Sequence, residues 1–369
     1  MTARTAVAAR LPDFPWDRLA PYGAIARAHP GGIADLSIGT PVDSTPAVVQ
    51  EALRSTADAP GYPYTAGTPS VREAAARWLG RALKVDVDPA NVLPTVGSKE
   101  LVALLPTLLG LGAGDRVVIP QLAYPTYDVG VRMAGATPVT SDGLLGVGPA
   151  AVGLLWVNSP ANPTGRVLPA EHLRKVVDWA RERGAVVASD ECYAAFGWEA
   201  EPVSILDPAV CGGSHEGLLA VHSLSKRSNL AGYRAGFVAG DPALVAELLE
   251  VRKQLGLIVA APVQAAMVAA LDDDAHVEEQ RARYAARRSV LRPALEAAGW
   301  QVEHSEAGLY LWARHPAYDG WASVARLAEL GVLVAPGDFY GAAGAGHIRV
   351  ALTATDERVT AAAERLRAL

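Results

Sequence analysis

The chain has 369 residues, half of them hydrophobic, and a formal net charge of −6. This length predicts two domains with sizeable cores. No apolar run reaches the roughly 18 residues of a membrane-spanning helix, and no basic block suggests nucleic acid as a partner. The first residues, MTARTAVAARLPDFPW, hold only a short alanine-rich patch and do not read as a signal peptide. We therefore expect a cytoplasmic protein that acts on small molecules.

Residues 1–45 contain several prolines and glycines, and we expect an arm that contributes to a smaller domain. From about residue 70 to 255, short apolar runs alternate with amphipathic helical patterns. The runs predict strands at 116–120, 137–140, 153–158, 185–190, 218–222 and 235–239. The amphipathic stretches predict helices at 71–83, 100–109 and 169–183. Alternation of this kind predicts a mostly parallel sheet covered on both faces, in a large domain of residues 46–260.

The last part of the chain, residues 261–369, predicts a smaller α+β domain. Its helical pattern runs from 262 to 298, and the acidic run at 272–274 has too few ligands for a calcium loop, so we interpret it as a helix break. Further strands are expected at 301–303, 308–313, 332–335 and 347–352, with a helix at 321–330.

Lysine is rare in this chain, which has 28 arginines and five lysines. An amine can lose its proton and attack a carbonyl, whereas a guanidinium stays charged. Lys226 lies in the phrase HSLSKRSNLAGYR after a predicted strand, with Ser223 and Ser225 before it and Arg234 after it. This spacing predicts a Schiff-base lysine beside a phosphate site. Lys84 and Lys175 lie on predicted amphipathic helices and are expected to be surface charges.

Other polar residues follow the predicted strands, where ligands of parallel sheets bind. Asp190 closes an apolar run, so its carboxylate would pair with a protonated pyridine nitrogen or cap a helix. Tyr193 and Asn162 could donate to a ring oxygen, or could pack and form a turn. Tyr124 could stack on a planar ring or pack on the surface.

Two further positions are typical of anion binding. Gly97, Ser98 and Lys99 begin a predicted helix, whose free N–H groups favour a phosphate; a simple Ser98 N-cap is the alternative. Arg349 lies within an apolar strand and needs a carboxylate, either from a substrate or from the protein itself.

Several motifs of other protein classes are absent or misplaced. The GLGAG stretch at 110–114 precedes a strand instead of following one, so it is no dinucleotide motif. No GxSxG or HExxH occurs, and we expect no metal. Cys192 and Cys211 have neither CxxC nor metal-ligand spacing, which favours two free thiols.

Taken together, these phrases resemble the class I/II aminotransferases, which are fold-type I pyridoxal-phosphate enzymes. The matching phrases are IGTP (38–41), YPYTAGTPSVREA (62–74), GSKE (97–100), AYPTY (123–127), NPTG (162–165), DECY (190–193), SLSKRSNLAGYR (223–234) and HIRVAL (347–352). The resemblance covers nearly the whole chain. It implies a mostly parallel seven-stranded sheet in a large domain plus a smaller α+β domain, the cofactor pyridoxal 5'-phosphate, and a homodimer with sites at the interface.

The resemblance also implies a role for each candidate residue. Lys226 would form the Schiff base, and Asp190 would pair with the pyridine nitrogen. Around the ring and its phosphate it implies contacts from Asn162, Tyr193, Tyr124, Ser98, Ser223, Ser225, Arg234 and the Gly97–Lys99 backbone. Arg349 and the backbone of Gly39 would bind the substrate carboxylate, and Tyr62 would reach the phosphate of the neighbouring subunit.

The substrate is suggested by the opening LPDFPWDRLAPY, the phrase DLSIGTPVD and the short length, which look like actinobacterial N-succinyldiaminopimelate aminotransferases. These transfer an amino group from glutamate to N-succinyl-2-amino-6-ketopimelate. Both partners are acidic, so a second cation is expected: Lys99 first, with Arg27, Arg252 and Lys253 as weaker candidates. The alternatives are an aspartate or broad-range aminotransferase, a carbon–sulfur lyase of the same fold, and a non-catalytic regulator.

Overall fold

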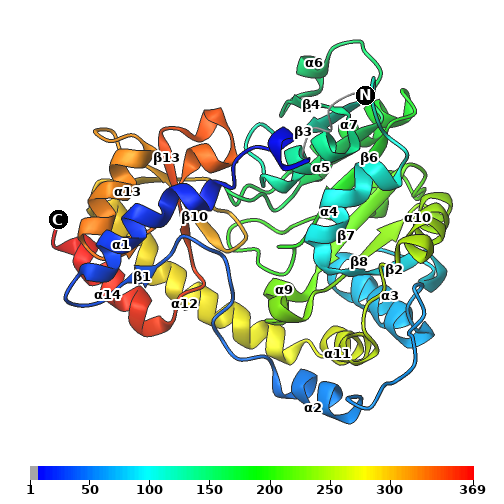
Figure 1. The fold of residues 1–369 in the computed structure, drawn as a ribbon, viewed down its shortest axis with the longest axis horizontal. Coiled ribbons are helices and arrows are strands. Elements are labelled where there is room, and N and C mark those ends of the chain that lie inside the picture. The colour runs from blue at the N-terminus through cyan, green and yellow to red at the C-terminus, as the bar shows by residue number, and fades with distance from the viewer. Residues whose placement is uncertain (1–6) are drawn as a thin grey trace, which may run out of the picture.

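The computed structural model describes residues 7–369, which form a large and a smaller lobe (Figure 1). The large lobe is built on a seven-stranded sheet in the order β2-β8-β7-β6-β5-β3-β4. Its strands are β2 (Val92–Val96), β3 (Arg116–Ile119), β4 (Thr137–Thr140), β5 (Leu154–Asn158), β6 (Val186–Asp190), β7 (Leu218–Ser223) and β8 (Ala235–Gly240). Only β8 runs antiparallel to its neighbours, so the expected mostly parallel sheet is confirmed.

The six predicted strands of this sheet form within two residues of their expected ends. The seventh strand, β2, was not predicted. It contains Pro94, which cannot donate to a ladder and argues against a central strand. The structure places β2 at the edge of the sheet, paired with β8 alone, where a proline is tolerated.

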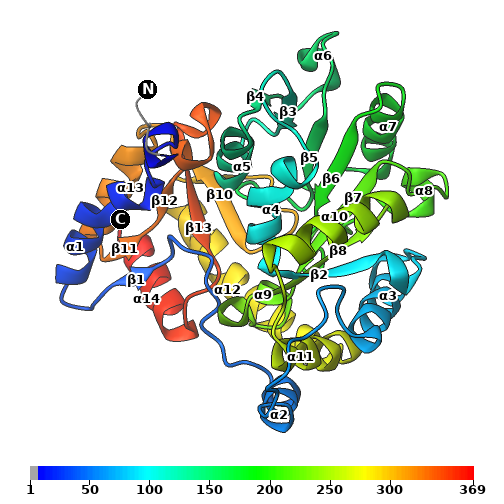
Figure 2. The ribbon, with the colours of Figure 1, turned by 45° about the vertical axis from the view of Figure 1, so that its right-hand side comes forward.

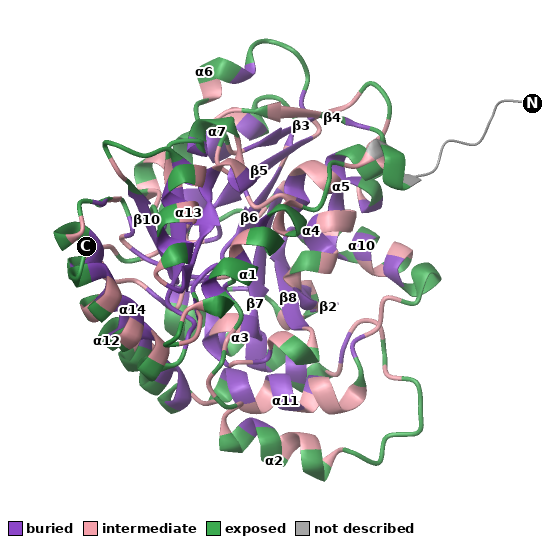
Figure 3. Ribbon diagram, turned by 60° about the vertical axis from the view of Figure 1, so that its left-hand side comes forward, coloured by how far each residue is buried: buried purple, intermediate pink, exposed green. Residues whose placement is uncertain are grey.

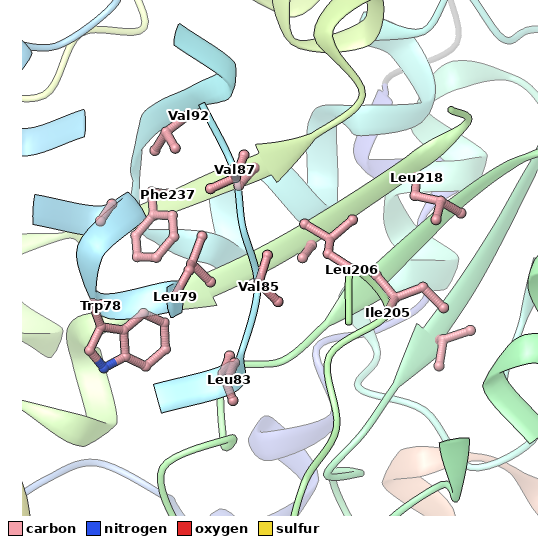
Figure 4. Close-up of a cluster of buried hydrophobic side chains, with 14 of the residues drawn as sticks. Trp78, Leu79, Leu83, Val85, Val87, Val92, Ile205, Leu206, Leu218 and Phe237 are labelled. Atoms are coloured by element: carbon pink, nitrogen blue, oxygen red, sulfur yellow. The ribbon is translucent and has the colours of Figure 1, made fainter. Parts of the chain in front are cut away.

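Helices cover both faces of this sheet, and the strands between them are buried (Figure 3). One face packs against α4 (Gly97–Leu108), α5 (Thr126–Ala134) and α10 (Pro242–Leu255). The other packs against α3 (Pro69–Leu83), α7 (Ala170–Arg181), α8 (Pro208–Cys211) and α11 (Ala261–Asp272), with α2 (Ala47–Ser55) on the outside of α11. Trp78 of α3 and Phe237 of β8 lie together in the core on this second face (Figure 4).

The smaller lobe has a four-stranded antiparallel sheet, in the order β12-β13-β10-β9. Figure 2 labels β12, β13 and β10 of this sheet. Its strands are β9 (Gln301–Glu303), β10 (Tyr310–Arg314), β12 (Ala335–Pro336) and β13 (His347–Ala351). The helices of this lobe are α1 (Ala20–Ala28), α12 (Ala275–Ala297), α13 (Gly320–Glu329) and α14 (Asp356–Arg367). β1 (Ala34–Asp35) pairs with β11 (Val332–Leu333), which ties the N-terminal segment to this lobe.

The predicted helical stretch 262–298 is two helices, α11 and α12, separated at the acidic run, as the expected helix break requires. α11 packs against α2 and α3 of the large lobe, whereas α12 packs against α14 of the smaller one. The division at residues 45 and 260 stays a proposal, and this packing favours placing its second boundary between α11 and α12. Within residues 7–369, no helix is long and apolar enough to cross a membrane.

Candidate active site

A cavity of about 340 Å³ lies beyond the carboxyl ends of β5, β6 and β7, between the two lobes. Segments far apart in the sequence therefore converge at this edge, as the parallel sheet predicts. Twelve of the predicted site residues line the cavity: Gly39, Ser98, Lys99, Tyr124, Asn162, Asp190, Tyr193, Ser223, Ser225, Lys226, Arg234 and Arg349. Gly97 does not line it but lies against the lining residue Arg234, and Tyr62 does not line it.

Lys226 is placed by the short helix α9 (Leu224–Arg227), which follows β7 directly. The Ser223 hydroxyl accepts the backbone N–H of Ser225 at 3.1 Å and so caps this helix. The Lys226 ammonium donates to the carbonyl oxygen of Gly39. Burial lowers the pKa of Lys226, with the Arg349 charge acting in the same direction, so the amine loses its proton more readily than an exposed lysine does.

Asp190 ends β6 with its carboxylate held from two sides. The Tyr127 hydroxyl donates to Oδ2 at 2.8 Å and the backbone N–H of Cys192 donates to Oδ1 at 3.1 Å. Burial raises the pKa of Asp190, and these hydrogen bonds offset part of that rise. The arrangement leaves a buried carboxylate that gains from a cationic partner.

A chain of hydrogen bonds joins Asp190 to Arg349 through two asparagines. The Asn158 amide donates to the carbonyl oxygen of Asp190 at 2.9 Å and accepts the Asn162 backbone N–H at 2.8 Å. Arg349 donates to Asn162 Oδ1 at 2.9 Å and to the Ser37 carbonyl oxygen at 2.8 Å. This chain fixes the positions of Asp190, Asn162 and Arg349 relative to one another.

The start of α4 forms a second polar corner of the cavity. Gly97 has φ 70°, and a Cβ atom at this position would overlap the Arg234 guanidinium. Glycine thus allows Arg234 to lie against the first N–H groups of the helix, where an anion is stabilised. Arg234 is itself held by a hydrogen bond of 2.9 Å to the Ala231 carbonyl oxygen.

Tyrosines that were not predicted surround Arg349. Its guanidinium carbon lies 3.9 Å from the ring centre of Tyr310 and 4.8 Å from that of Tyr340. The Tyr310 hydroxyl lies 3.1 Å from that of Tyr193, and a Cβ on Gly39 would overlap it. Burial raises the pKa of Tyr193; burial acts the same way on Tyr310, but the Arg349 and Lys226 charges outweigh it and lower the pKa of Tyr310.

A sequence signal for these tyrosines existed but was incomplete. Tyr127 belongs to the same phrase AYPTY as Tyr124. Tyr310 and Arg349 face the same side of the small sheet, because Arg349 pairs with Trp312 and Tyr310 lies two residues from Trp312. That inference requires the strand pairing, which the sequence alone does not supply.

Of the candidates for a second cation, only Lys99 lies in the cavity, with its amine 5.6 Å from the ring centre of Tyr124. The suggestion of Arg252 was wrong, because that side chain is fully buried and forms a two-point ion pair with Glu100, at 2.8 and 3.1 Å. Lys253 pairs with Glu250 on the surface of α10, and Arg27 is exposed on α1. Neither of these two lines the cavity.

Tyr62 is 98% exposed and does not line the cavity of its own chain. Its neighbour Tyr64 is also exposed. The position of Tyr62 leaves its ring free to meet a second molecule.

A sequence model described as "Aminotransferase class I and II" matches residues 32–366. The chain is 62% identical over 356 residues to the 4-dedimethylamino-4-oxo-anhydrotetracycline transaminase OxyQ of Streptomyces rimosus, covering 96% of this chain and 99% of that one. It is 62% identical over 367 residues to the probable aminotransferase Rv1178 of Mycobacterium tuberculosis, covering 99% of this chain and 87% of that one. An LL-diaminopimelate aminotransferase of Aquifex aeolicus is 34% identical over 91% of each chain. An aminotransferase structure from Neisseria meningitidis superposes with a TM-score of 0.89, at 31% identity and 99% coverage of both chains.

Proposed function

Because the chain belongs to the class I and II aminotransferases, we propose that it moves an amino group between glutamate and an acidic 2-keto acid. The observation that carries this proposal is the charge of the cavity. Lys99, Lys226, Arg234 and Arg349 line it, and Asp190 is its only lining carboxylate among the described residues. A protein of net charge −6 thus concentrates cations where acidic ligands would bind.

The family and fold depend on pyridoxal 5'-phosphate, which is the cofactor of this chain. The described residues fit this group: the cavity combines an amine, a buried carboxylate, and a helix start with an arginine packed against its glycine. We propose that Ser98, Ser223, Ser225, Arg234 and the backbone at Gly97–Lys99 hold the phosphate. Tyr124 would lie against the ring, and Asn162 and Tyr193 would meet its hydroxyl. When bound, the cofactor supplies an electron sink for the bond broken at the substrate Cα.

Lys226 is proposed as the catalytic amine. Its lowered pKa makes the neutral form more accessible, and that form can attack a carbonyl and can accept the proton from the substrate Cα as a general base. The same amine, once protonated, can return that proton as a general acid. The carbonyl oxygen of Gly39 accepts from the amine and so orients it.

Asp190 is proposed to keep the cofactor nitrogen protonated. Its carboxylate lacks a cationic partner within ion-pair distance among the described residues, and a buried carboxylate is most stable beside a positive charge. Tyr127 and the Cys192 N–H hold it in place without supplying that charge.

Arg349 is proposed to bind the substrate α-carboxylate, with the Gly39 backbone beside it. The guanidinium is pre-oriented by Asn162, the Ser37 carbonyl oxygen and two tyrosine rings, while its Nε has no hydrogen-bond partner among the described residues. A fixed guanidinium fork matches a carboxylate in geometry and charge. Lys99 then remains for a second carboxylate, which is the basis for proposing acidic substrates.

The acceptor we propose is N-succinyl-2-amino-6-ketopimelate, in the biosynthesis of diaminopimelate and lysine. The chain's resemblance at its N-terminus and in DLSIGTPVD supports this, and relatives at about one third identity carry the name LL-diaminopimelate aminotransferase. We also propose a cytoplasmic homodimer in which Tyr62 reaches the site of the partner subunit. The free thiols of Cys192 and Cys211 suit that compartment.

A second candidate substrate class is a bulky ring ketone. The relative named for such a substrate is 62% identical, and the outer cavity wall includes the apolar side chains of Phe14, Trp16 and Ile38. Apolar walls favour a hydrophobic ring system over a flexible dicarboxylate.

The test is a panel of amino donors and keto acceptors with purified holoenzyme. Turnover is measured as the consumption of glutamate. The panel includes the succinylated ketopimelate, oxaloacetate, pyruvate and a polycyclic ketone. We expect the succinylated acceptor to give the highest kcat/KM and oxaloacetate a lower one. The highest kcat/KM for the polycyclic ketone would replace the first proposal by the second, and release of sulfide or pyruvate from cysteine conjugates would identify a lyase.

Lys99→Ala separates the acidic-substrate proposal from a phosphate role. We expect kcat/KM to fall about tenfold or more for dicarboxylic donors and to change little for alanine or phenylalanine, because only the former place a second carboxylate near the amine. Equal losses for all donors would contradict a substrate role. Lys253→Ala, on the surface of α10, is the matched control.

A further inference from the structure

A second cavity, of about 660 Å³, lies behind the active site, where α3 and α12 approach the segment 194–202. This volume falls within the roughly 300–1,000 Å³ of small-molecule sites in proteins. Its lining includes Trp78 and Trp198 together with charged residues of both signs. None of these residues lines the active-site cavity.

Arg227 lines this rear cavity and directly follows Lys226 at the end of α9. Its side chain is 4% exposed, yet only Nη1 makes a hydrogen bond, to the Ala270 carbonyl oxygen at 2.9 Å. Nε and Nη2 make no hydrogen bond to any residue that the structure describes. The nearest carboxylate oxygen, on Asp274, lies 3.8 Å from Nη2.

Buried donors without partners are rare and unfavourable in native proteins. Burial lowers the pKa of Arg227 to about 10, because the nearby Asp274 charge offsets only part of the cost of burying the guanidinium. Nε and Nη2 are moreover the two donors on one edge of the guanidinium, which together bind both oxygens of a carboxylate. The Trp78 ring, 5.1 Å from the guanidinium carbon, supports one face of the group (Figure 4 shows Trp78 in its core).

The remaining charges of the rear cavity favour a ligand that also carries an amine. Arg81 is bound to Asp274, and Glu199 is bound to Arg288 and Arg292. Glu201 and Glu278 have only long pairs, at 3.7 Å to Lys84 and 3.6 Å to Arg281. The cavity that Arg227 lines is therefore also lined by two loosely paired carboxylates, both exposed to solvent.

We propose that the rear cavity is a binding site for a small amino carboxylate, whose carboxylate pairs with Arg227 and whose ammonium lies toward Glu278 and Glu201. The site is distinct from the substrate pocket, and the proposal does not depend on which keto acid the enzyme uses. Because Arg227 and Lys226 are adjacent on a helix of four residues, occupancy of the rear cavity restrains the segment that carries the catalytic amine.

The test uses full-length holoenzyme treated with borohydride, so that Lys226 is fixed to the cofactor and the active site exchanges no amine. Calorimetric titration with 6-aminohexanoate is expected to give saturable binding of one molecule per chain. Hexanoate, which lacks the amine, and hexylamine, which lacks the carboxylate, are each expected to bind at least tenfold more weakly. Equal binding of hexanoate would overturn the amine contact, and absence of saturable binding of 6-aminohexanoate would overturn the site.

Two variants locate the binding. Arg227→Gln is expected to weaken 6-aminohexanoate at least tenfold, whereas Arg77→Gln, an exposed residue of α3 paired with Asp272 outside the cavity, is expected to leave it unchanged. Should Arg227→Gln fail to fold, Ala82→Trp obstructs the rim of the cavity from an exposed position and is expected to have the same effect. Unchanged binding in either folded variant would place the ligand elsewhere.

Hydrogen exchange tests the coupling to the active site. With 6-aminohexanoate bound, amide exchange in the segment 224–230 is expected to slow at least threefold in the wild-type chain and to remain unchanged in the Arg227→Gln or Ala82→Trp variant. Binding without this protection would contradict the link to α9.

Discussion

The two ends of the active-site cavity are built in different ways. The cofactor end rests on one continuous sheet, because Asp190 ends β6, the helix of Lys226 follows β7 directly and α4 follows β2 directly. The substrate end is assembled from the small sheet and the N-terminal segment, where Arg349 bonds to Asn162 and to the Ser37 carbonyl oxygen across 187 and 312 residues of chain. We therefore expect changes at the first end to affect chemistry and cofactor, and changes at the second to affect substrate affinity.

Lys226→Ala gives the largest expected effect. Loss of the amine removes both the nucleophile and the general base, so turnover is expected to fall roughly 10⁴-fold. The absorbance of the cofactor Schiff base should disappear while the circular dichroism spectrum is retained. Lys175→Ala, an exposed residue paired with Glu171 on α7, is the control. A Lys226→Ala protein with wild-type turnover would sink the assignment.

Arg349→Gln tests the substrate end. Removing a buried, pre-oriented cation is expected to lower kcat/KM, mainly by raising KM, while the cofactor absorbance stays intact. The loss corresponds to about 2–5 kcal/mol of transition-state stabilisation. Arg326→Gln, on the exposed side of α13, should leave both unchanged. Loss of cofactor in the Arg349 variant would mean that the two ends are not separable in this way.

The contrast also explains what the sequence could predict. Residues of the cofactor end follow apolar runs that are typical of strands, so Asp190, Ser223 and Lys226 could be placed at one sheet edge from the sequence alone. Tyr310 and Tyr340 reach Arg349 only through pairing of the small sheet and its following turn, which no local pattern specifies. The same reason explains the wrong suggestion of Arg252, whose partner Glu100 lies 152 residues away.

A buried pair beneath the cofactor end gives a prediction about pH. Glu191 follows Asp190, and its Oε2 lies 3.4 Å from His222 Nε2, with both side chains buried. Burial raises the pKa of Glu191 to about 7 from 4.5, so the folded chain holds this proton more tightly than the unfolded chain. The contribution of Glu191 to stability is therefore full below pH 4.5 and is lost as the pH rises through 7.

Glu191→Gln removes this titration but keeps an oxygen for the Ile205 backbone N–H. The difference in free energy of unfolding, variant minus wild type, is expected to rise by roughly 2–3 kcal/mol as the pH increases from about 5 to about 8. Burial lowers the pKa of His222 to about 3, so this imidazole is neutral in the folded chain throughout the pH range tested. Urea unfolding at the two pH values measures the change. A pH-independent difference, like that expected for exposed Glu329→Gln, would contradict a buried titrating Glu191.

Tyr127→Phe is expected to have the smallest effect and tests how far the cofactor end depends on support from behind. The variant removes one of the two donors to the Asp190 carboxylate and leaves the Cys192 N–H in place. A hydrogen bond to a charged group contributes about 1.5–3 kcal/mol, and the bound cofactor's own positive charge compensates part of that loss. We therefore expect cofactor affinity to fall about tenfold, with KM for glutamate unchanged because Arg349 is untouched. Tyr318→Phe in the smaller lobe is the control. A raised KM for glutamate with unchanged cofactor affinity in Tyr127→Phe would mean that Tyr127 supports substrate binding instead.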